Sequence, residues 1–388
     1  MGRRRDTVLI EQETSDFYPR SNRDGLPVTG HEESMNKIRV LTVDDSAVMR
    51  QVLAMLLTKD PHIEVVGSAP DPYVAREKIK ALNPDVLTLD VEMPKMDGLT
   101  FLEKLMRGHP MPVVMVSSLT EVSCQTTLRA LELGAVDFIA KPKMDLREGM
   151  EEIAQDLITK VKAAALARVR GKEVGGRDDQ KSIASHTSPL SSGSAMIKTT
   201  DTIIAIGSST GGTEAVKEIL ERLPPHTPPI LITQHMPERF TKTWADRLNR
   251  LCRIVVKEAQ DGDSVLPGHA LIAPGNFHMT LVRSGARYRV RTDQDLPVNR
   301  HRPSVDVMFA SVARHAGGNA VGIILTGMGG DGAKEMLTMK QAGALTIAQD
   351  EASCVVFGMP KEAIKIGAVD KVLPLDGIAG AILAYVGR

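Results

Sequence analysis

The chain has 388 residues, with 48 acidic and 48 basic side chains, a hydrophobic fraction of 42% and an aromatic fraction of 3%. This length exceeds what one ordinary core needs, so we expect two domains of roughly 100 to 200 residues each. The zero net charge disfavours a DNA-binding protein, and the scarcity of aromatic side chains disfavours a base-stacking surface. Cys124, Cys252 and Cys354 are widely separated and outline neither a disulfide framework nor a zinc site.

Residues 1–34 are polar and show no sustained hydrophobic periodicity. We interpret them as a disordered N-terminal extension. No apolar run approaches the roughly 18 residues that cross a bilayer, and the basic residues after Met1 lead into polar residues instead of a signal-peptide core. We therefore expect a soluble cytoplasmic protein that does not insert into a membrane.

The region 35–158 alternates between apolar, strand-like runs and amphipathic, helix-like segments. The strand-like runs are 40–43, 65–67, 86–89, 113–116 and 138–139, and the helix-like segments include 47–57 and 74–82. Five such strand and helix units predict a parallel sheet with helices on both faces. We expect this region to form the first α/β domain.

A linker and a second α/β domain are expected to follow. Residues 171–200 are rich in Gly, Ser, Asp and Lys, and we place a flexible linker at 159–200. Buried strands are predicted at 202–206, 230–233, 270–273, 321–325 and 345–348, with helical stretches between them. Residues 201–388 are therefore expected to form a second doubly wound, Rossmann-like domain with a parallel sheet.

A group of acidic residues follows the strands of the first domain. Asp44 and Asp45 come directly after one strand and Asp90 after another, so their carboxylates would meet at the carboxyl edge of a parallel sheet. Clustered carboxylates suit Mg²⁺, and a carboxylate beside that metal can accept a phosphoryl group. Ser117 and Lys141 follow the fourth and fifth strands and could contact the phosphate. A lone aspartate is more often a loop residue or a helix cap, but this combined order favours a phosphorylation switch.

This order, together with the segment 90–98 (DVEMPKMDG) and Lys141-Pro142, closely resembles the receiver domain of two-component response regulators. The resemblance implies that Asp90 is the phosphoacceptor and that a histidine kinase is the phosphodonor. It also implies a Mg²⁺ site made by Asp44, Asp45, Asp90 and the backbone carbonyl of Glu92, with Ser117 and Lys141 as switch residues.

Three short signatures lie where hydrophobic runs of the second domain end. They are 207–212 (GSSTGG), 234–237 (QHMP) and 327–332 (GMGGDG). Together they supply a serine, a histidine and an aspartate. Hydrolysis of an ester or amide by a protein nucleophile needs a hydroxyl, a base and an acid that orients the base. A serine hydrolase is therefore the leading hypothesis for this domain.

Ser209 is the candidate nucleophile, because residues 207–211 fit the G-x-S-x-G elbow, in which glycines permit a sharp turn from strand to helix. His235 ends a strand-like run, so its imidazole could reach the same sheet edge. Asp331 lies in a glycine-dense turn whose N–H groups could stabilise an oxyanion. The order serine, histidine, aspartate differs from that of the α/β-hydrolases and disfavours that fold. The neighbouring Ser208 leaves open which hydroxyl attacks.

The three signatures, with the segments 299–306 (NRHRPSVD) and 352–360 (ASCVVFGMP), closely resemble the chemotaxis protein-glutamate methylesterase family. The resemblance runs from about residue 201 to the C-terminus, and a preceding receiver domain and linker complete that family's architecture. It implies a catalytic triad of Ser209 as nucleophile, His235 as general base and Asp331 as orienting acid. It also implies an oxyanion and substrate site, in which the backbone N–H of Met328 helps to bind the oxyanion and Thr210 and His301 line the cleft.

This resemblance implies phosphorylation-regulated hydrolysis of glutamate γ-methyl esters on chemoreceptors, with release of methanol, and deamidation of specific receptor glutamines. The implied partners are methyl-accepting chemoreceptors and a chemotaxis histidine kinase, with no nucleic acid. Mg²⁺ belongs to the receiver, and the esterase step needs no cofactor. We further expect the unphosphorylated receiver to pack over the serine cleft.

Two alternatives remain open from the residues alone. The turn 207–212 could bind phosphate at a helix N-terminus, as in a nucleotide-binding α/β domain, although neither a dinucleotide fingerprint nor a G-K-[ST] loop is present. The second domain could instead bind nucleic acid or a protein partner without catalysis. The neutral charge, the few aromatic residues and the serine, histidine and aspartate signatures disfavour this second alternative.

Overall fold

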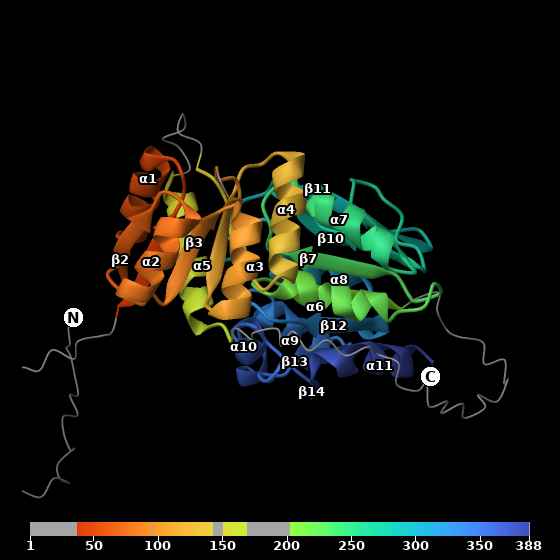
Figure 1. Ribbon diagram of the computed structural model, residues 1–388. Coiled ribbons are helices and arrows are strands. Elements are labelled where there is room, and N and C mark those ends of the chain that lie inside the picture. The colour runs from red at the N-terminus through yellow and green to blue at the C-terminus, as the bar shows by residue number, and fades with distance from the viewer. Residues whose placement is uncertain (1–36, 95, 143–149, 169–201, 388) are drawn as a thin grey trace, which may run out of the picture. The chain divides into compact units, whose positions relative to one another are not determined.

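The computed structural model describes residues 37–94, 96–142, 150–168 and 202–387 (Figure 1). The predicted N-terminal extension 1–34 and most of the predicted linker 159–200 lie outside these ranges. Among the helices within the ranges, none combines the length and the apolar composition that crossing a bilayer requires.

The first sheet has five parallel strands in the order β2-β1-β3-β4-β5. The strands are β1 (Ile38–Val43), β2 (Ile63–Ala69), β3 (Val86–Asp90), β4 (Val113–Ser117) and β5 (Asp137–Ala140). Strands β3 and β4 are buried along their whole length, as expected for a parallel sheet covered on both faces. The predicted five-stranded parallel sheet is therefore confirmed.

Helices cover both faces of this sheet. They are α1 (Ala47–Leu57), α2 (Pro72–Leu82), α3 (Gly98–Gly108), α4 (Glu121–Glu132) and α5 (Met150–Leu166). Successive strand residues point to opposite faces. Val40 of β1 accordingly belongs to one apolar cluster with Leu53 of α1 and Leu157 of α5, whereas Leu41 belongs to another with Ile79 of α2 and Leu102 of α3.

Helix α5 continues past residue 158, where the sequence pattern places the end of the first domain. Leu157, Val161 and Ala164 are all fully buried. Their spacing of four and three residues keeps them on one face of the helix. The apolar face thus continues to the last turn of α5, and residues 159–166 are helical instead of forming part of a flexible linker.

The start of α3 lies against the end of β3. A Cβ atom built on Gly98 would be 2.0 Å from the carbonyl oxygen of Asp90, a distance that no side chain tolerates. The N–H of Gly98 donates to the carbonyl oxygen of Val91 at 3.0 Å, and Asp97 caps the helix by accepting from the N–H of Thr100 at 2.8 Å. Glycine at position 98 therefore sets the backbone around Asp90.

The second sheet has seven parallel strands in the order β14-β13-β12-β6-β7-β9-β8. The strands are β6 (Ile203–Ser208), β7 (Ile230–Gln234), β8 (Val255–Glu258), β9 (His269–Ile272), β12 (Ala320–Ile324), β13 (Leu345–Gln349) and β14 (Lys371–Leu373). The hydrophobic pattern predicts the five inner strands. It does not reveal the edge strands β8 and β14, because both are short and partly exposed.

Two groups of helices and a hairpin cover this second sheet. Helices α6 (Gly212–Glu221), α7 (Phe240–Leu251) and α11 (Leu375–Val386) contribute to one apolar cluster, and α8 (Val305–His315), α9 (Ala333–Gln341) and α10 (Met359–Lys365) to the other. The antiparallel hairpin of β10 (His278–Ser284) and β11 (Arg287–Asp293) also joins the second cluster. A short 3₁₀ turn, Gly317–Asn319, precedes β12.

The order of the strands identifies the edge at which a ligand site is expected. The chain runs outward from β6 to β7 on one side, and later places β12 on the other side of β6. Ligands bind doubly wound sheets at such a reversal, outside the carboxyl ends of the strands. The segments that follow β6, β7 and β12 therefore meet where a site is expected.

We expect Gly98→Ala to lower the free energy of unfolding of the first domain by at least 1–3 kcal/mol, the usual cost of overpacking, because the added methyl group meets backbone. Gly108→Ala, at the other end of α3, is the matched control, since a Cβ there has no neighbour within 4 Å. Urea unfolding followed by circular dichroism compares the two variants. Equal midpoints would contradict the packing account.

Candidate functional site

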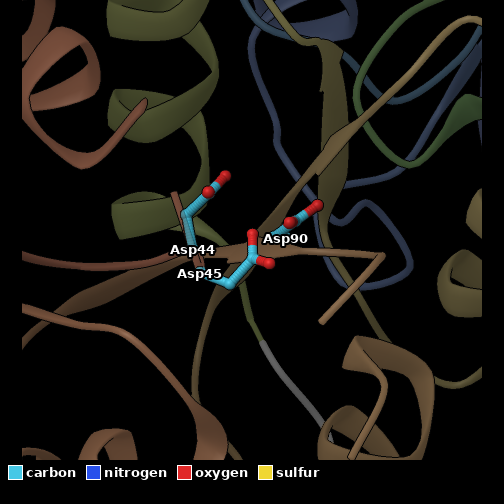
Figure 2. A group of neighbouring side chains, drawn as sticks. All are labelled: Asp44, Asp45 and Asp90. Carbon is cyan, nitrogen blue, oxygen red and sulfur yellow. The ribbon is translucent and has the colours of Figure 1, made fainter. Parts of the chain in front are cut away.

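Three aspartates gather at the carboxyl edge of the first sheet (Figure 2). Asp44 and Asp45 follow β1, and Asp90 ends β3, the neighbouring strand. Carboxylate oxygens of the three residues lie within 4.8 Å of one another. Asp44 and Asp90 are fully buried, whereas Asp45 is exposed. The predicted acidic cluster therefore forms, with one side open to solvent.

Lys141, which follows β5, is the cation of this cluster. Its Nζ atom lies 2.7 Å from Asp90 Oδ2 and 3.4 Å from Asp44 Oδ2. Burial raises the pKa of Asp90 to about 6, although Lys141 acts in the opposite direction. Burial likewise raises the pKa of Asp44. One lysine thus does not compensate two buried carboxylates fully.

The negative charge that Lys141 leaves uncompensated suits a divalent cation. Asp44 Oδ2 is buried and accepts no hydrogen bond of good geometry, so a ligand position is available there. The donor set of Asp44, Asp45 and Asp90 consists of hard oxygen atoms, which Mg²⁺ prefers. The backbone of Glu92 lies beside this cluster, because its N–H donates to Asp90 Oδ1 at 3.2 Å. These residues fit the predicted Mg²⁺ site.

Ser117 ends β4 beside this cluster, but its hydroxyl is engaged elsewhere. It accepts from the Thr127 hydroxyl of α4 at 2.7 Å and lies 3.2 Å from the Ser118 carbonyl oxygen and 3.4 Å from that of Ser123. A contact between Ser117 and a phosphoryl group on Asp90 would therefore require a change in these bonds.

The second site lies at the carboxyl ends of β6, β7 and β12, as the strand order predicts. Ser209 follows β6, His235 follows β7, and Asp331 lies in the turn after β12. Backbone hydrogen bonds continue the sheet into these segments: the N–H of Ser209 donates to the Thr326 carbonyl oxygen at 3.0 Å, and the N–H of His235 to the Ser208 carbonyl oxygen at 3.2 Å.

His235 and Asp331 form a buried pair. His235 Nε2 lies 2.8 Å from Asp331 Oδ2, and the side chains are 7% and 1% exposed. Although burial acts to raise it, the pKa of Asp331 is held well below its usual range by His235 and by hydrogen bonds from Asn299 and Ser304. An ionised aspartate can orient the imidazole and stabilise its protonated form.

The other ring nitrogen of His235, Nδ1, is buried and has no hydrogen-bond partner. Because Nε2 is taken by Asp331, Nδ1 is the atom left to accept a proton from a nucleophile. Within the described ranges, the Ser209 hydroxyl makes no hydrogen bond either. The pair His235 and Asp331 is thus assembled, whereas a bond between Ser209 and His235 is not formed in this state.

The two neighbouring serines differ in their surroundings. Ser208 is fully buried, and its hydroxyl donates to Gln234 Oε1 at 2.6 Å. Ser209 is partly exposed, while its carbonyl oxygen accepts from Gln234 Nε2 at 2.9 Å. A Cβ on Gly327 would lie 2.7 Å from Ser209 Cβ, so position 327 must be glycine for the turn at Ser209 to pack against it. The geometry therefore favours Ser209 as the reactive hydroxyl.

Of the predicted oxyanion and substrate residues, His301 contacts this pair directly. His301 stacks on His235 with ring centroids 3.7 Å apart and an angle of 12° between the planes. Thr210 is buried, and its hydroxyl donates to Asp137 Oδ2 on β5. In the described part of the chain, the N–H of Met328 has no acceptor, whereas that of Gly327 donates to the Val356 carbonyl oxygen at 3.0 Å.

Comparisons with known proteins agree with this arrangement of two sites. A family model described as CheB methylesterase matches residues 204–382, and one described as response regulator receiver domain matches residues 40–154. Three relatives carry the name protein-glutamate methylesterase/protein-glutamine glutaminase, and the name of the first of them ends with the number 1. They are from Geobacter metallireducens (61% identical, 91% of this chain and 97% of the relative), Pectobacterium atrosepticum (58%, 91% and 98%) and Salmonella typhimurium (57%, 91% and 98%). The chain belongs to this methylesterase family.

In this member of the methylesterase family, several residues at the second site have roles that the sequence patterns do not predict. Asn299 and Ser304 donate to Asp331 Oδ1, each at 2.7 Å, and Gln234 holds Ser208. All three lie inside segments that carry the family resemblance. Residue type and spacing do not reveal such roles, because the bonds join positions 26 to 32 residues apart.

We expect Ser209→Ala to lose covalent labelling by a serine-directed fluorophosphonate, while Ser208→Ala keeps it. The reason is that Ser208 is buried and bonded to Gln234, whereas the hydroxyl of the partly exposed Ser209 makes no hydrogen bond within the described residues. Mass spectrometry of tryptic peptides locates the label. A label on Ser208 in the unmodified chain would contradict this assignment.

Burial, and then the charge of His235, lowers the pKa of His301 to about 3. An unfolded chain protonates this histidine near pH 6.5, so protonation favours the unfolded state. Stability should therefore fall as the pH drops from about 6.5 towards about 3, and the fall should be smaller in His301→Gln. Thermal melts at several pH values test this, with the exposed His226→Gln as control. An unchanged pH dependence in His301→Gln would contradict it.

Proposed function

We propose that this protein hydrolyses γ-glutamyl methyl esters on chemoreceptors, releasing methanol, and deamidates specific receptor glutamines to glutamate during chemotaxis adaptation. The observation that carries the proposal is the buried pair of His235 and Asp331 at the sheet edge where the partly exposed Ser209 follows the neighbouring strand β6. Relatives that are 57% to 61% identical over about nine-tenths of the chain bear the names of these two activities.

Ser209 attacks the ester carbonyl carbon, and His235 takes the hydroxyl proton on Nδ1. Asp331, bonded to Nε2 at 2.8 Å, stabilises the imidazolium that forms. We assign the N–H of Met328, which has no acceptor among the described residues, as a donor to the oxyanion of the tetrahedral intermediate. His235 then returns the proton to the leaving methoxide, which departs as methanol.

Water completes the reaction by attacking the acyl-enzyme. His235 again takes a proton, now from the water, and gives it to Ser209 as the ester bond to the enzyme breaks. The products are a free γ-carboxylate on the receptor and regenerated enzyme. With glutamine as substrate the same steps release ammonia in place of methanol.

Asp90 is the residue that we propose as phosphoacceptor, with a chemotaxis histidine kinase as donor. Its raised pKa and the nearby Lys141 are features of a carboxylate adapted to react. Mg²⁺, held by Asp44, Asp45, Asp90 and the carbonyl of Glu92, would neutralise charge on the phosphoryl group. Lys141 would pair with the phosphate after transfer.

Contacts between the two domains support control of the esterase by the receiver. The Thr210 hydroxyl, in the turn that carries Ser209, bonds to Asp137 on β5. Glu132 of α4 accepts from Arg247 of α7 and lies 3.3 Å from Lys217 of α6. We propose that the unphosphorylated receiver restricts access to Ser209 and that phosphorylation shifts the population toward an accessible form.

The nucleotide-binding alternative is disfavoured by the packing of the turn 207–212. A Cβ on Gly211 would lie 2.6 Å from Val355, and one on Gly212 would lie 2.2 Å from Gln234 Oε1. Side chains therefore occupy the space beside these glycines, and the N–H of Gly212 already donates to the Ser209 carbonyl oxygen at 2.7 Å. A phosphate-binding turn instead leaves its glycine N–H groups open to the ligand.

The test of the proposal is methanol release from receptor membranes that carry radiolabelled methyl esters. The wild-type chain should release methanol, and Mg²⁺ with a small phosphodonor should raise the rate. Ser209→Ala should release none, because it lacks the attacking hydroxyl. Asp90→Asn should keep the basal rate but gain nothing from the phosphodonor. No release by the wild-type chain, or release by Ser209→Ala, would refute the esterase, and stimulation of Asp90→Asn would refute the switch.

A further inference from the structure

The side chain of Asn299 lies between two buried carboxylates. Its Nδ2 atom is 2.7 Å from Asp331 Oδ1 and also 2.7 Å from Asp306 Oδ2. Both aspartates are buried, with 3% of the whole Asp331 residue and 8% of the whole Asp306 residue exposed. In the described part of the chain, neither carboxylate pairs with a lysine or arginine. The amide group of Asn299 is therefore the one side-chain donor that both anions share.

Asp306 supports the turn that carries Asp331. Its Oδ1 atom accepts from the N–H of Gly332 at 3.0 Å and from that of Glu335 at 3.1 Å, at the start of α9. Asp306 thus caps the helix that begins two residues after Asp331. Burial, and then the charge of Asp331, raises the pKa of Asp306, which reflects two like charges brought together.

Asparagine suits this position for a chemical reason. Two nearby anions in a buried site repel each other unless donors lie between them. A primary amide offers two N–H bonds on one nitrogen and no net charge. It can therefore satisfy one oxygen of each aspartate without competing with His235 as a cation.

The backbone places the amide there. Asn299 and Arg300 have φ angles of 53° and 68°. The turn is closed by bonds from the Val298 N–H to the His301 carbonyl oxygen at 3.1 Å and in the reverse direction at 2.9 Å. Left-handed conformations at both central positions define a type I′ turn, which favours asparagine. The same turn places His301 on the ring of His235.

The bonds to Asp331 divide by oxygen atom. Oδ1 accepts from Asn299 and from the Ser304 hydroxyl, each at 2.7 Å, and from the backbone N–H of Asp306 at 3.3 Å. Oδ2 accepts from the Val305 N–H at 2.7 Å and faces His235. Fixing Oδ1 fixes the rotation of the carboxylate. Oδ2 is then held toward the imidazole.

We propose that Asn299 is a positioning residue for the esterase reaction, which holds Asp331 toward His235 and separates it from Asp306. This inference rests on the proposed function. It assigns Asn299 no contact with substrate, so its loss should act on the chemical step and not on substrate binding.

Two variants distinguish the effect of the amide donors from the effects of the backbone conformation and of the side-chain shape. Asn299→Gly keeps the left-handed turn accessible and removes both donors. Asn299→Asp keeps the shape but replaces the donors with a third carboxylate. Asn83→Gly is the matched control, because Asn83 also has a positive φ of 44° and caps α2 in the receiver domain.

Methanol release by the full-length chain, with Mg²⁺ and phosphodonor, gives kcat and KM for each variant. We expect kcat of Asn299→Gly to fall by about 10- to 100-fold, the effect of losing a hydrogen bond to a charged group, with KM nearly unchanged. Asn299→Asp should be slower still, and Asn83→Gly should match the wild type. The thermal midpoint of Asn299→Gly should lie below that of Asn83→Gly, because two buried carboxylates lose their shared donor, so kcat and KM are measured well below both midpoints.

A wild-type kcat in Asn299→Gly, or an Asn299→Asp variant as active as the wild type, would overturn the inference. So would a rise in KM without a fall in kcat, which would make Asn299 a substrate contact. These results leave the proposed function intact as long as the wild type is active and Ser209→Ala is not. An inactive wild type would instead refute the proposed function and this inference together.

Discussion

The second site is organised by the need to satisfy one buried anion, Asp331. Burying a carboxylate costs several kcal/mol unless hydrogen bonds replace the lost water. The donors to Asp331 come from the end of β7, the turn before α8 and the first residues of α8. Segments far apart in sequence thus converge on a single side chain, and the loop geometry of the site depends on keeping that side chain ionised.

In the receiver site the pKa of the buried aspartate is shifted in the opposite direction. Asp90 has Lys141 and one backbone N–H as donors, and burial raises its pKa to about 6. Asp331 has more donors and a lowered pKa. The contrast follows from chemistry: a carboxylate that accepts a phosphoryl group needs reactive lone pairs and room for a metal, whereas one that orients a base must not change its state during turnover.

Much of the architecture follows from local patterns, and the rest depends on contacts between distant segments. The inner strands of both sheets are continuous apolar runs, so they are predictable, whereas the edge strands β8 and β14 are short and half solvated. The β10 and β11 hairpin was missed, although its two-residue loop begins with a glycine at φ 63°. Glycine-rich signatures point to Ser209, His235 and Asp331, whose roles remain predictions. The function of Asn299 depends on Asp306 and Asp331 meeting in space, which no spacing reveals.

The stacking of His301 on His235 has a consequence for the charge that appears during turnover. When His235 takes a proton, its ring becomes a cation that is nearly excluded from water. His301 lies parallel to it at 3.7 Å and, with a pKa of about 3, is neutral at physiological pH. The transient cation therefore meets the electron-rich face of an uncharged ring. A His301 with an ordinary pKa near 6.5 would be protonated in part of the molecules at neutral pH and would then repel the imidazolium, so the burial of His301 keeps the proton on His235 alone.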